Sequence, residues 1–381
     1  MEDRRAAEVF PPGEFLKEEL EARGWTQTDL AEILGRPLRL VNEIISGKRS
    51  ISPETAKGLG DALGTSAQFW LNLESAYQLS RVPSHDDAVA RRARLYDRAP
   101  IKEMIRRNWI EHSQNVAVLE QRVLDFLGVK NLDEQPEFYP HAARKSSAYE
   151  QITPAQRVWL LRSRQLAPAV SASPFSRRRL NDLVRQLRTL TQSPEDVRHV
   201  PRLLANMGIR LLVVEPLAGT RIDGVCFWLG DRSPVVVLSL RYDRIDYFWY
   251  TLMHELGHVR NRDGLNGDWP SLDTDMVAAR ARRTDQKPHR EELADQFAVE
   301  TLIPQEDLED FILRVRPLYS AMRIQGFANR IGVHAGIVVG QLQHRGEVSY
   351  AQHRRMLSPV RHIITHAALT DGWGTSLPAA M

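Results

Sequence analysis

The sequence predicts a mainly α-helical protein with a small β-sheet, an α+β class in which the sheet is confined to the second half of the chain. Three observations predict this class. Residues 13–80 form short segments with apolar residues at helical spacing, the middle of the chain is also helical in pattern, and β-branched runs begin near residue 209. The 381 residues are enough for two or three domains, and we divide them at 1–80, 81–200, 201–350 and 351–381.

The composition is that of an ordinary globular protein. Hydrophobic residues make up 43% and charged residues 26%, which excludes wholesale disorder. The single cysteine, Cys226, cannot form an internal disulfide, which fits a reducing compartment. No apolar run approaches the ~20 residues that span a bilayer, and Met1–Arg5 leads into no apolar signal core. We therefore expect a soluble cytoplasmic protein without a membrane partner, and the net charge of +3 indicates a polyanionic partner only weakly.

The first domain begins with three predicted helices, each followed by a glycine. Thr26 can cap the second helix, with Asp29 three residues later in the acidic position of a capping box. Pro37 suits the first turn of the third helix, because its missing N–H would have no intrahelical partner there. The predicted helices end at Gly24, run from Gln27 to Leu34, and run from Pro37 to Ser46-Gly47.

Two short helices joined by a glycine turn fit a helix-turn-helix, whose second helix enters the major groove of DNA. Arg36, Arg39 and Asn42 would face the groove, where Arg suits guanine edges and Asn suits adenine. Phosphate contacts would come from Gln27, Lys48 and Arg49. The same spacing also fits a helical bundle that only binds other proteins, and the pattern alone leaves both interpretations open.

Several short segments of the first domain carry a resemblance to a known family. They are Pro12-Gly13-Glu14-Phe15-Leu16, Thr26-Gln27-Thr28-Asp29-Leu30-Ala31, Ile45-Ser46-Gly47-Lys48-Arg49, Ile51-Ser52-Pro53-Glu54-Thr55-Ala56, Gly64-Thr65-Ser66 and Phe69-Trp70-Leu71-Asn72-Leu73. Through them, residues 12–80 resemble the HigA-type branch of the XRE helix-turn-helix family, the antitoxin repressors of toxin–antitoxin operons. The resemblance implies binding to double-stranded operator DNA, a homodimer, and a cognate toxin as a further partner.

The middle of the chain contains no catalytic cluster. Val116–Leu127 and Leu180–Leu190 have amphipathic helical spacing, and Trp109 and Trp159 are expected in the core. Ala167–Ser173 is rich in Pro, Ala and Ser and predicts a loop or linker. We expect a helical region that connects the two ends of the chain.

Strand patterns appear after residue 208. Ile209–Val214 is a short β-branched run, and Val225–Trp228 and Pro234–Leu240 bracket the turn Gly230–Ser233. These segments predict a small sheet with a hairpin.

The motif His254-Glu255-Leu256-Gly257-His258 follows this predicted sheet. Histidines four apart on a helix project from the same face, so both imidazoles can reach one metal ion. Glu255 lies beside them, where it can accept a proton from a metal-bound water.

A second acidic segment lies further along the chain at Glu291–Ala298. Glu291 can complete a two-His, one-Glu shell that leaves a fourth position open to water, the catalytic form of a zinc site. Asp295, one helical turn on, can accept the outer N–H of a ligand histidine. Glu292 points about 100° away and is the weaker ligand candidate. The alternative is an exposed acidic face, but apolar residues in the segment indicate a packed helix.

The two motifs together resemble the gluzincin peptidases, whose second helix carries Glu-x-x-(Ala/Ser)-Asp. Further segments that fit a known family are Leu238-Ser239-Leu240-Arg241-Tyr242, Asp246-Tyr247-Phe248-Trp249, Leu302-Ile303-Pro304 and Gly336–His344. With them, about residues 200–345 are similar to the ImmA/IrrE family of metallopeptidases. The resemblance implies a zincin-like domain that cleaves repressor proteins, notably helix-turn-helix repressors.

Three C-terminal features add further expectations. Arg260–Arg290 is long, polar and rich in Asp and Arg, which departs from the family pattern and suggests a mobile insert. His334, near the family's C-terminal motif, could stabilise a tetrahedral oxyanion, although a helix-capping or exposed histidine is the alternative. The residues from Ala367 on predict a frayed tail.

These features predict a DNA-binding transcriptional regulator with a zinc-dependent endopeptidase domain. His254, His258 and Glu291 would hold zinc, and Glu255 would act as general base. The expected substrate is a protein, either a partner repressor or antitoxin or the chain's own linker, paired as an added strand along the sheet edge. The rival prediction is a HigA-like antitoxin or repressor whose metal domain is a sensor or scaffold. A purely structural zinc site is disfavoured, because it would leave Glu255 without an evident role.

Overall fold

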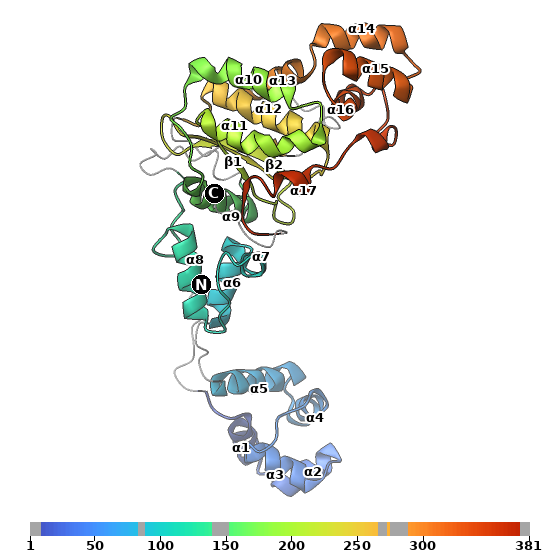
Figure 1. Ribbon diagram of the computed structural model, residues 1–381. Helices are drawn as coiled ribbons and strands as arrows, with labels where there is room; N and C mark the ends of the chain where they lie inside the picture. Colours follow the sequence, from blue (N-terminus) through green and yellow to red (C-terminus); the bar gives the residue numbers. More distant parts are fainter. Residues whose placement is uncertain (1–8, 83–87, 139–151, 266–272, 275–288, 374–381) are drawn as a thin grey trace. The chain divides into compact units, whose positions relative to one another are not determined.

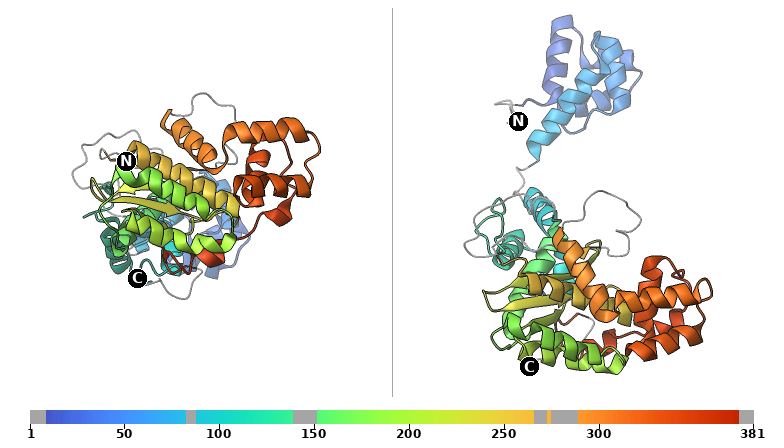
Figure 2. Two further views of the ribbon diagram at one scale, coloured as in Figure 1. Left: turned by 45° about the horizontal axis from the view of Figure 1, so that its top comes forward. Right: turned by 90° about the horizontal axis from the view of Figure 1, so that it is seen from above.

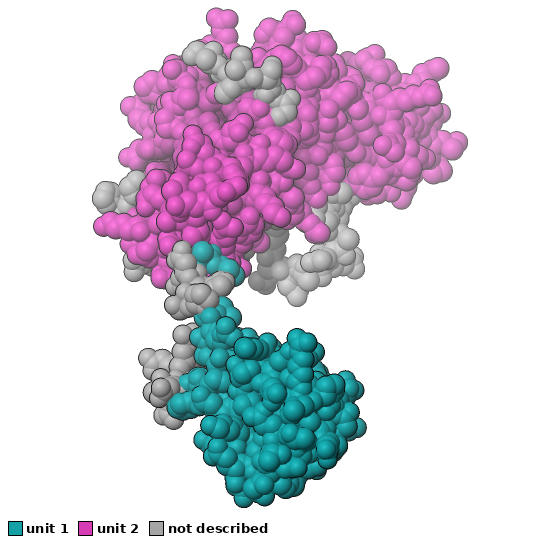
Figure 3. Space-filling view, turned by 90° about the horizontal axis from the view of Figure 1, so that it is seen from below, with its two compact units in different colours: residues 1–89 teal, residues 90–381 magenta. Residues whose placement is uncertain are grey.

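The computed structural model describes residues 9–82, 88–138, 152–265, 273–274 and 289–373. The chain divides into two compact units, residues 1–89 and 90–381, which are coloured separately in Figure 3. Each unit has its own hydrophobic core. Among the described residues, no helix has the length and apolar character needed to cross a bilayer.

The first unit is a bundle of short helices. Leu16, Leu30, Leu59 and Trp70 are fully buried at its centre. Its helices are α1 (Pro12–Arg23), α2 (Gln27–Leu34), α3 (Leu38–Ile45), α4 (Pro53–Leu63) and α5 (Ala67–Arg81), labelled in Figure 1.

The helix signals of the sequence are confirmed in this unit with one small difference. Helix α2 has the predicted bounds and the complete capping box of Thr26 and Asp29. Gly24 and Gly35 take the left-handed conformation that ends α1 and α2. Helix α3 begins at Leu38, so Pro37 is its N-cap residue and does not lie in its first turn.

The second unit is built on a five-stranded sheet with the order β4-β2-β3-β1-β5. The predicted hairpin is confirmed, since β2 and β3 pair antiparallel with Val225 opposite Val237. β1 runs parallel to both β3 and β5, whereas β2 and β4 are antiparallel. The strands are β1 (Arg210–Val213), β2 (Ile222–Trp228), β3 (Pro234–Leu238), β4 (Asp273–Thr274) and β5 (Leu369–Thr370).

Helices cover both faces of this sheet. Figures 1 and 2 show α10 (Leu180–Thr189), α11 (Val200–Asn206) and α12 (Ile245–Asn261) together over one face. On the opposite face, Trp159 of α9 (Pro154–Leu166) donates from Nε1 to the Val214 carbonyl oxygen at 3.0 Å. The layers place α12 directly against β2 and β3.

The remaining helices complete the second unit. Helices α14, α15 and α16 form a cluster beside one end of α12 (Figure 1). The helices not yet given are α6 (Ala88–Arg98), α7 (Ile101–Arg106), α8 (Val116–Leu127), α13 (His289–Leu302), α14 (Gln305–Val315), α15 (Ala321–Ile331), α16 (Ala335–Arg345) and α17 (Arg361–Ile364). Trp109 and Trp159 are buried, as predicted.

Two predictions for irregular segments need correction in part. Ala167–Ser173 begins with a 3-10 turn at Ala167–Ala169 and continues as the predicted loop, but Ala167 and Val170 are buried, so the segment packs against the core and is not a free linker. The prediction of a frayed tail from Ala367 is wrong as far as residue 373, because Leu369–Thr370 form β5 and pair with β1. Buried Asp371 then lies 3.4 Å from the Arg107 guanidinium. Most of the insert predicted at Arg260–Arg290 lies outside the described residues.

Candidate metal centre and nucleic-acid interface

Helix α12 presents both histidines of the predicted motif on one buried face. The Nε2 atoms of His254 and His258 are 3.0 Å apart. Their side chains are almost inaccessible, since the two residues are 1% and 5% exposed. Because the residues are one helical turn apart, the helix itself sets this convergence.

Helix α13 brings Glu291 to the same point. Its Oε2 lies 3.4 Å from the Nε2 atom of each histidine, and the three ligand atoms all lie within 4.8 Å of one another. Gly257 permits this approach, because a Cβ there would lie 2.9 Å from the Ala294 Cα of α13. Glu292 is exposed and pairs with His289, so it does not join the cluster.

Each histidine also has a carboxylate at its outer nitrogen. Asp295 Oδ1 lies 2.9 Å from His254 Nδ1, as the sequence predicted, and it accepts a hydrogen bond of 2.7 Å from the Tyr250 hydroxyl. Asp263 Oδ2 lies 2.8 Å from His258 Nδ1. A carboxylate in this position fixes the tautomer and orientation of a metal-binding imidazole.

Asp263 is a site residue that the sequence analysis missed. It follows Arg262, whose left-handed backbone ends α12 and turns the chain back towards His258. Trp228 of β2 holds it there by donating from Nε1 to the Asp263 carbonyl oxygen at 2.8 Å. The available signal was an acidic residue five positions after the second histidine, just beyond the end of the helix.

Glu255 lies between the two histidines in sequence and is fully buried. Its carboxylate packs against the backbone of β2, so closely that a Cβ at Gly224 would overlap Oε1. Thr251, one turn earlier on α12, contacts the same point. The candidate general base therefore faces the sheet at Gly224.

The donor set fits a zinc ion. Two imidazole nitrogens and one carboxylate oxygen converge on one point, and zinc prefers such ligands in a four-coordinate arrangement. Three protein ligands leave the fourth position for water or substrate, which is the arrangement of catalytic zinc sites. The outer carboxylates of Asp263 and Asp295 complete this pattern.

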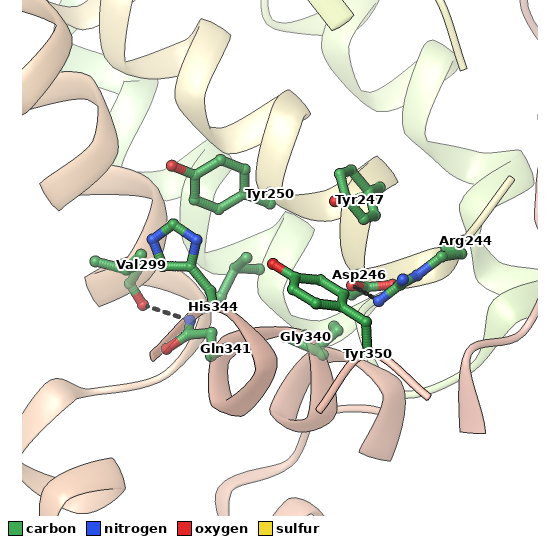
Figure 4. Close-up of a pocket in the computed structure, with 11 residues that line it drawn as sticks. Arg244, Asp246, Tyr247, Tyr250, Val299, Gly340, Gln341, His344 and Tyr350 are labelled. Carbon is green, nitrogen blue, oxygen red and sulfur yellow. Dashed lines mark hydrogen bonds and ion pairs between the residues drawn. The ribbon is translucent and has the colours of Figure 1, made fainter. Parts of the chain in front are cut away.

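A separate pocket is lined in part by Tyr250, whose hydroxyl donates to Asp295, the carboxylate at the outer nitrogen of His254 (Figure 4). The tyrosines Tyr247, Tyr250 and Tyr350 line it together with apolar side chains from α13 and α16. Arg244 pairs with Asp246 at 2.7 Å, and desolvation raises the pKa of the Asp246 carboxyl against the lowering effect of that arginine. Tyr250 connects the two regions, because it lines the pocket and donates to Asp295.

His334 lies away from the metal cluster. It is the N-cap of α16, where its Nδ1 accepts a hydrogen bond of 3.1 Å from the Gly336 N–H. Gly336 packs against Ile245 in the first turn of α12, nine residues before His254, which is a rise of about 13 Å along the helix. Burial lowers the pKa of the imidazole, which favours its neutral, hydrogen-bond-accepting form. The structure thus gives His334 the capping position and does not bring it to the cluster.

The candidate nucleic-acid face lies on α3 of the first unit. Arg39 and Asn42 are exposed and three residues apart, so they share one face of the helix. Lys48 and Arg49 are also exposed just beyond its end, and Gln27 is half-buried at the first position of α2. These five side chains therefore lie on α3 and the adjoining helix ends.

Arg36 is also exposed. It lies in the turn between α2 and α3 and pairs with Glu54 of α4. Glu43 also lies within the candidate face, where it pairs with Arg39 at 2.7 Å and with Arg49 at 3.0 Å. The hydrogen bond from Arg39 lowers the pKa of the Glu43 carboxyl, so Glu43 stays ionised.

The fold and the sites define a helix-turn-helix protein joined to a metallopeptidase-related domain. Residues 16–70 match the helix-turn-helix family model, and residues 206–358 match the model of the IrrE N-terminal-like domain. The chain therefore belongs to the XRE-type helix-turn-helix family through its first unit and carries an IrrE-like domain in its second, as the sequence predicted.

Similar proteins cover about a fifth of this chain. Virulence-associated protein A of Dichelobacter nodosus is 45% identical over 76 residues, which are 19% of this chain and 74% of that protein. The uncharacterized HTH-type transcriptional regulator YddM of Escherichia coli (strain K12) is 30% identical over 84 residues, 22% of this chain and 88% of that protein. A solved structure of Pseudomonas aeruginosa antitoxin HigA with the higBA promoter is 39% identical and covers 19% of this chain and 80% of its own, with a TM-score of 0.19.

Proposed function

We propose that this protein is a DNA-binding transcriptional regulator whose second unit is a zinc-dependent endopeptidase. The observation that carries the proposal is the convergence of His254, His258 and Glu291, with Glu255 buried on the same helix between the two histidines. Its substrate would be a protein, either a partner repressor or antitoxin or a segment of this chain. A single buried cysteine fits the proposed cytoplasmic location.

The residues have distinct parts in the proposed hydrolysis. His254, His258 and Glu291 would hold zinc, with Asp295 and Asp263 orienting the two imidazoles. When bound, zinc supplies an electrophile that polarises a peptide carbonyl and makes a water molecule more acidic. Glu255 takes the proton of the attacking water and returns it to the amine leaving group.

The β2 strand supplies the place for the substrate chain. An extended peptide can add to a sheet as a further strand, held by main-chain hydrogen bonds. Gly224 of β2 contacts Glu255, so a peptide paired at Gly224 would lie next to the proposed base. This arrangement supports an endopeptidase that acts on extended polypeptide.

For the first unit, we propose binding to double-stranded operator DNA through α3. Arg39 and Asn42 would contact bases, and Gln27, Lys48 and Arg49 would contact phosphates. Arg36, the third residue proposed to face the groove, would contact DNA in place of Glu54. A homodimer and a cognate toxin remain part of the proposal through the resemblance to HigA-type antitoxins.

The second candidate function is a repressor or antitoxin whose metal centre is a sensor or scaffold. The burial of the cluster favours it, because Glu255 is 0% exposed and Glu291 is 6% exposed. A protein substrate cannot reach such residues unless a covering segment moves.

The Glu255→Gln substitution separates the two functions. It keeps the size of the side chain and removes the base, so zinc content and DNA affinity should remain at the wild-type level. Cleavage of proteins encoded next to this chain, followed by mass spectrometry with zinc present, should fall by at least ~100-fold. Glu292→Gln, on the exposed side of α13, is the matched control and should cleave like wild type. Equal cleavage by Glu255→Gln and wild type would favour the sensor or scaffold.

A further inference from the structure

The sheet edge proposed for the substrate is occupied by the chain itself. The strand order β4-β2-β3-β1-β5 places β4 next to β2, on the side away from β3. β4 comprises Asp273–Thr274, from the long segment between the two metal-binding motifs. It pairs antiparallel with β2, with Thr274 opposite Ile222 and Asp273 opposite Gly224.

The pairing of β4 with β2 includes the residue that contacts Glu255, the proposed general base. Gly224 pairs with Asp273 of β4 along the sheet and contacts Glu255 from α12 across its face. A strand paired at Gly224 therefore lies beside the carboxylate that would remove the proton from water. A substrate strand would need the same backbone groups of β2.

The ladder between β4 and β2 is irregular. Its register shifts between Ile222 and Gly224, as at a β-bulge. A bulge leaves one residue unpaired and turns the strand locally. Here two steps along β2, from Ile222 to Gly224, correspond to one step along β4, so the extra residue is Asp223 of β2. β4 therefore covers this edge outside the regular register of a paired strand.

We propose that β4 is a built-in inhibitory strand that takes the place of the substrate on β2, an inhibition that presupposes the proposed peptidase function. As part of the same chain, β4 has an effective concentration in the millimolar range, well above that of a dilute protein substrate. The burial of His254, Glu255 and His258 is consistent with a closed resting state. Cleavage then begins only when β4 leaves the edge of β2.

A simpler role for β4 is protection of a sheet edge. Short edge strands and bulges also prevent sheets from pairing with other chains. The two roles differ in their effect on catalysis, because a protective strand can be weakened without any gain in cleavage.

The experiment weakens β4 by Thr274→Pro, since proline cannot donate to a ladder. Thr274→Val keeps a good strand residue and is the matched control. The first measurement is amide hydrogen exchange of Ile222–Gly224 in the metal-free full chain. The second is zinc-dependent cleavage of fluorescein-labelled casein, with Glu255→Gln as the blank. Thr274→Gly, which weakens a strand through backbone entropy, repeats both measurements in a protein without the added proline.

If β4 inhibits cleavage, Thr274→Pro should show faster hydrogen exchange at Ile222–Gly224 and casein cleavage at least about tenfold above wild type. Thr274→Val should behave like wild type in both measurements. Unchanged hydrogen exchange at Ile222–Gly224 would show that β4 does not protect the edge of β2. If hydrogen exchange is faster but wild type and variant cleave casein equally, and the cleavage depends on Glu255, the proposed inhibition is overturned. The proposed peptidase function would then still stand. No Glu255-dependent cleavage by any of the proteins would contradict the peptidase function, and the inhibition with it.

Discussion

The two units hold their candidate functional side chains in opposite surroundings. In the first unit, Arg39 lies on α3 with its side chain 86% exposed, and its partner Glu43 follows one helical turn later. In the second unit, Glu255 and His254 are buried, and Glu291 comes from a different helix more than thirty residues further along the chain. An exposed candidate face can thus be built from one helix and the chain next to its ends, whereas a buried polar cluster requires a core that joins distant segments.

The surroundings also determine how each site responds to a partner. Ion pairs such as Arg39–Glu43 are exposed and screened by salt, so Arg39 can exchange Glu43 for another partner at little cost. In the second unit, the buried Glu291 carboxylate lies 3.4 Å from both imidazoles, and the half-buried carboxylates of Asp295 and Asp263 lie at their outer nitrogens. A metal ion entering this cluster would meet the three proposed ligands already in position.

The largest effect is expected from His258→Ala. Wild-type protein should carry close to one zinc per chain, and the variant should carry almost none, because only two ligands remain. Metal analysis of the purified proteins by mass spectrometry measures this. His289→Ala, an exposed histidine at the start of α13, should keep its zinc. Full occupancy in His258→Ala would show that the ligand assignment is wrong.

The next largest effect is expected when the two side chains proposed to contact DNA bases are removed. Arg39→Ala combined with Asn42→Ala should weaken specific binding to the chain's own promoter region at least ~30-fold, since two base contacts are lost. A gel-shift titration measures the affinity, and Lys17→Ala on α1 serves as a control outside this face. The zinc content of the double variant should stay at the wild-type level. Unchanged affinity for DNA would favour the helical bundle that only binds proteins.

The outer carboxylates should have an intermediate effect. Asp295→Asn and Asp263→Asn should each lower zinc affinity by about 10- to 100-fold, because each imidazole loses the anion that fixes its orientation. Competition with a zinc chelator measures the affinity. Asp310→Asn, an exposed residue of α14, is the matched control. Wild-type affinity in Asp263→Asn would mean that the contact with His258 has no influence on the metal.

The smallest expected effects compare equivalent caps in the two units. Thr26 caps α2 and Thr153 caps α9, each through a complete capping box. Replacing either threonine by alanine should cost about 1 kcal/mol. Because the units have separate cores, Thr26→Ala should lower the melting temperature of the smaller unit by about 4–8 °C, and Thr153→Ala that of the larger unit by no more than about 2–4 °C. Differential scanning calorimetry resolves the two transitions, and equal shifts of both transitions by either variant would contradict separate cores.

The sequence by itself determined the features that depend on neighbouring residues. The capping box of Thr26, the bounds of α2 and α8, and the β2–β3 hairpin all follow from short-range patterns of capping, periodicity and turn residues. The convergence of His254 and His258 belongs to the same class, because the helix fixes their relation.

Tertiary structure alone decided the features that join distant segments. Asp263 reaches His258 because a left-handed turn ends α12 and Trp228 holds that turn. The tail folds as β5 because β1 offers it a free edge, which its own composition does not indicate. The same holds for Arg36, whose partner Glu54 lies on another helix. It holds also for β4, which pairs with β2 at Gly224, where β2 contacts Glu255. The physical reason is that main-chain pairing and close packing depend on which surfaces meet, and a sequence pattern of a few residues does not contain that information.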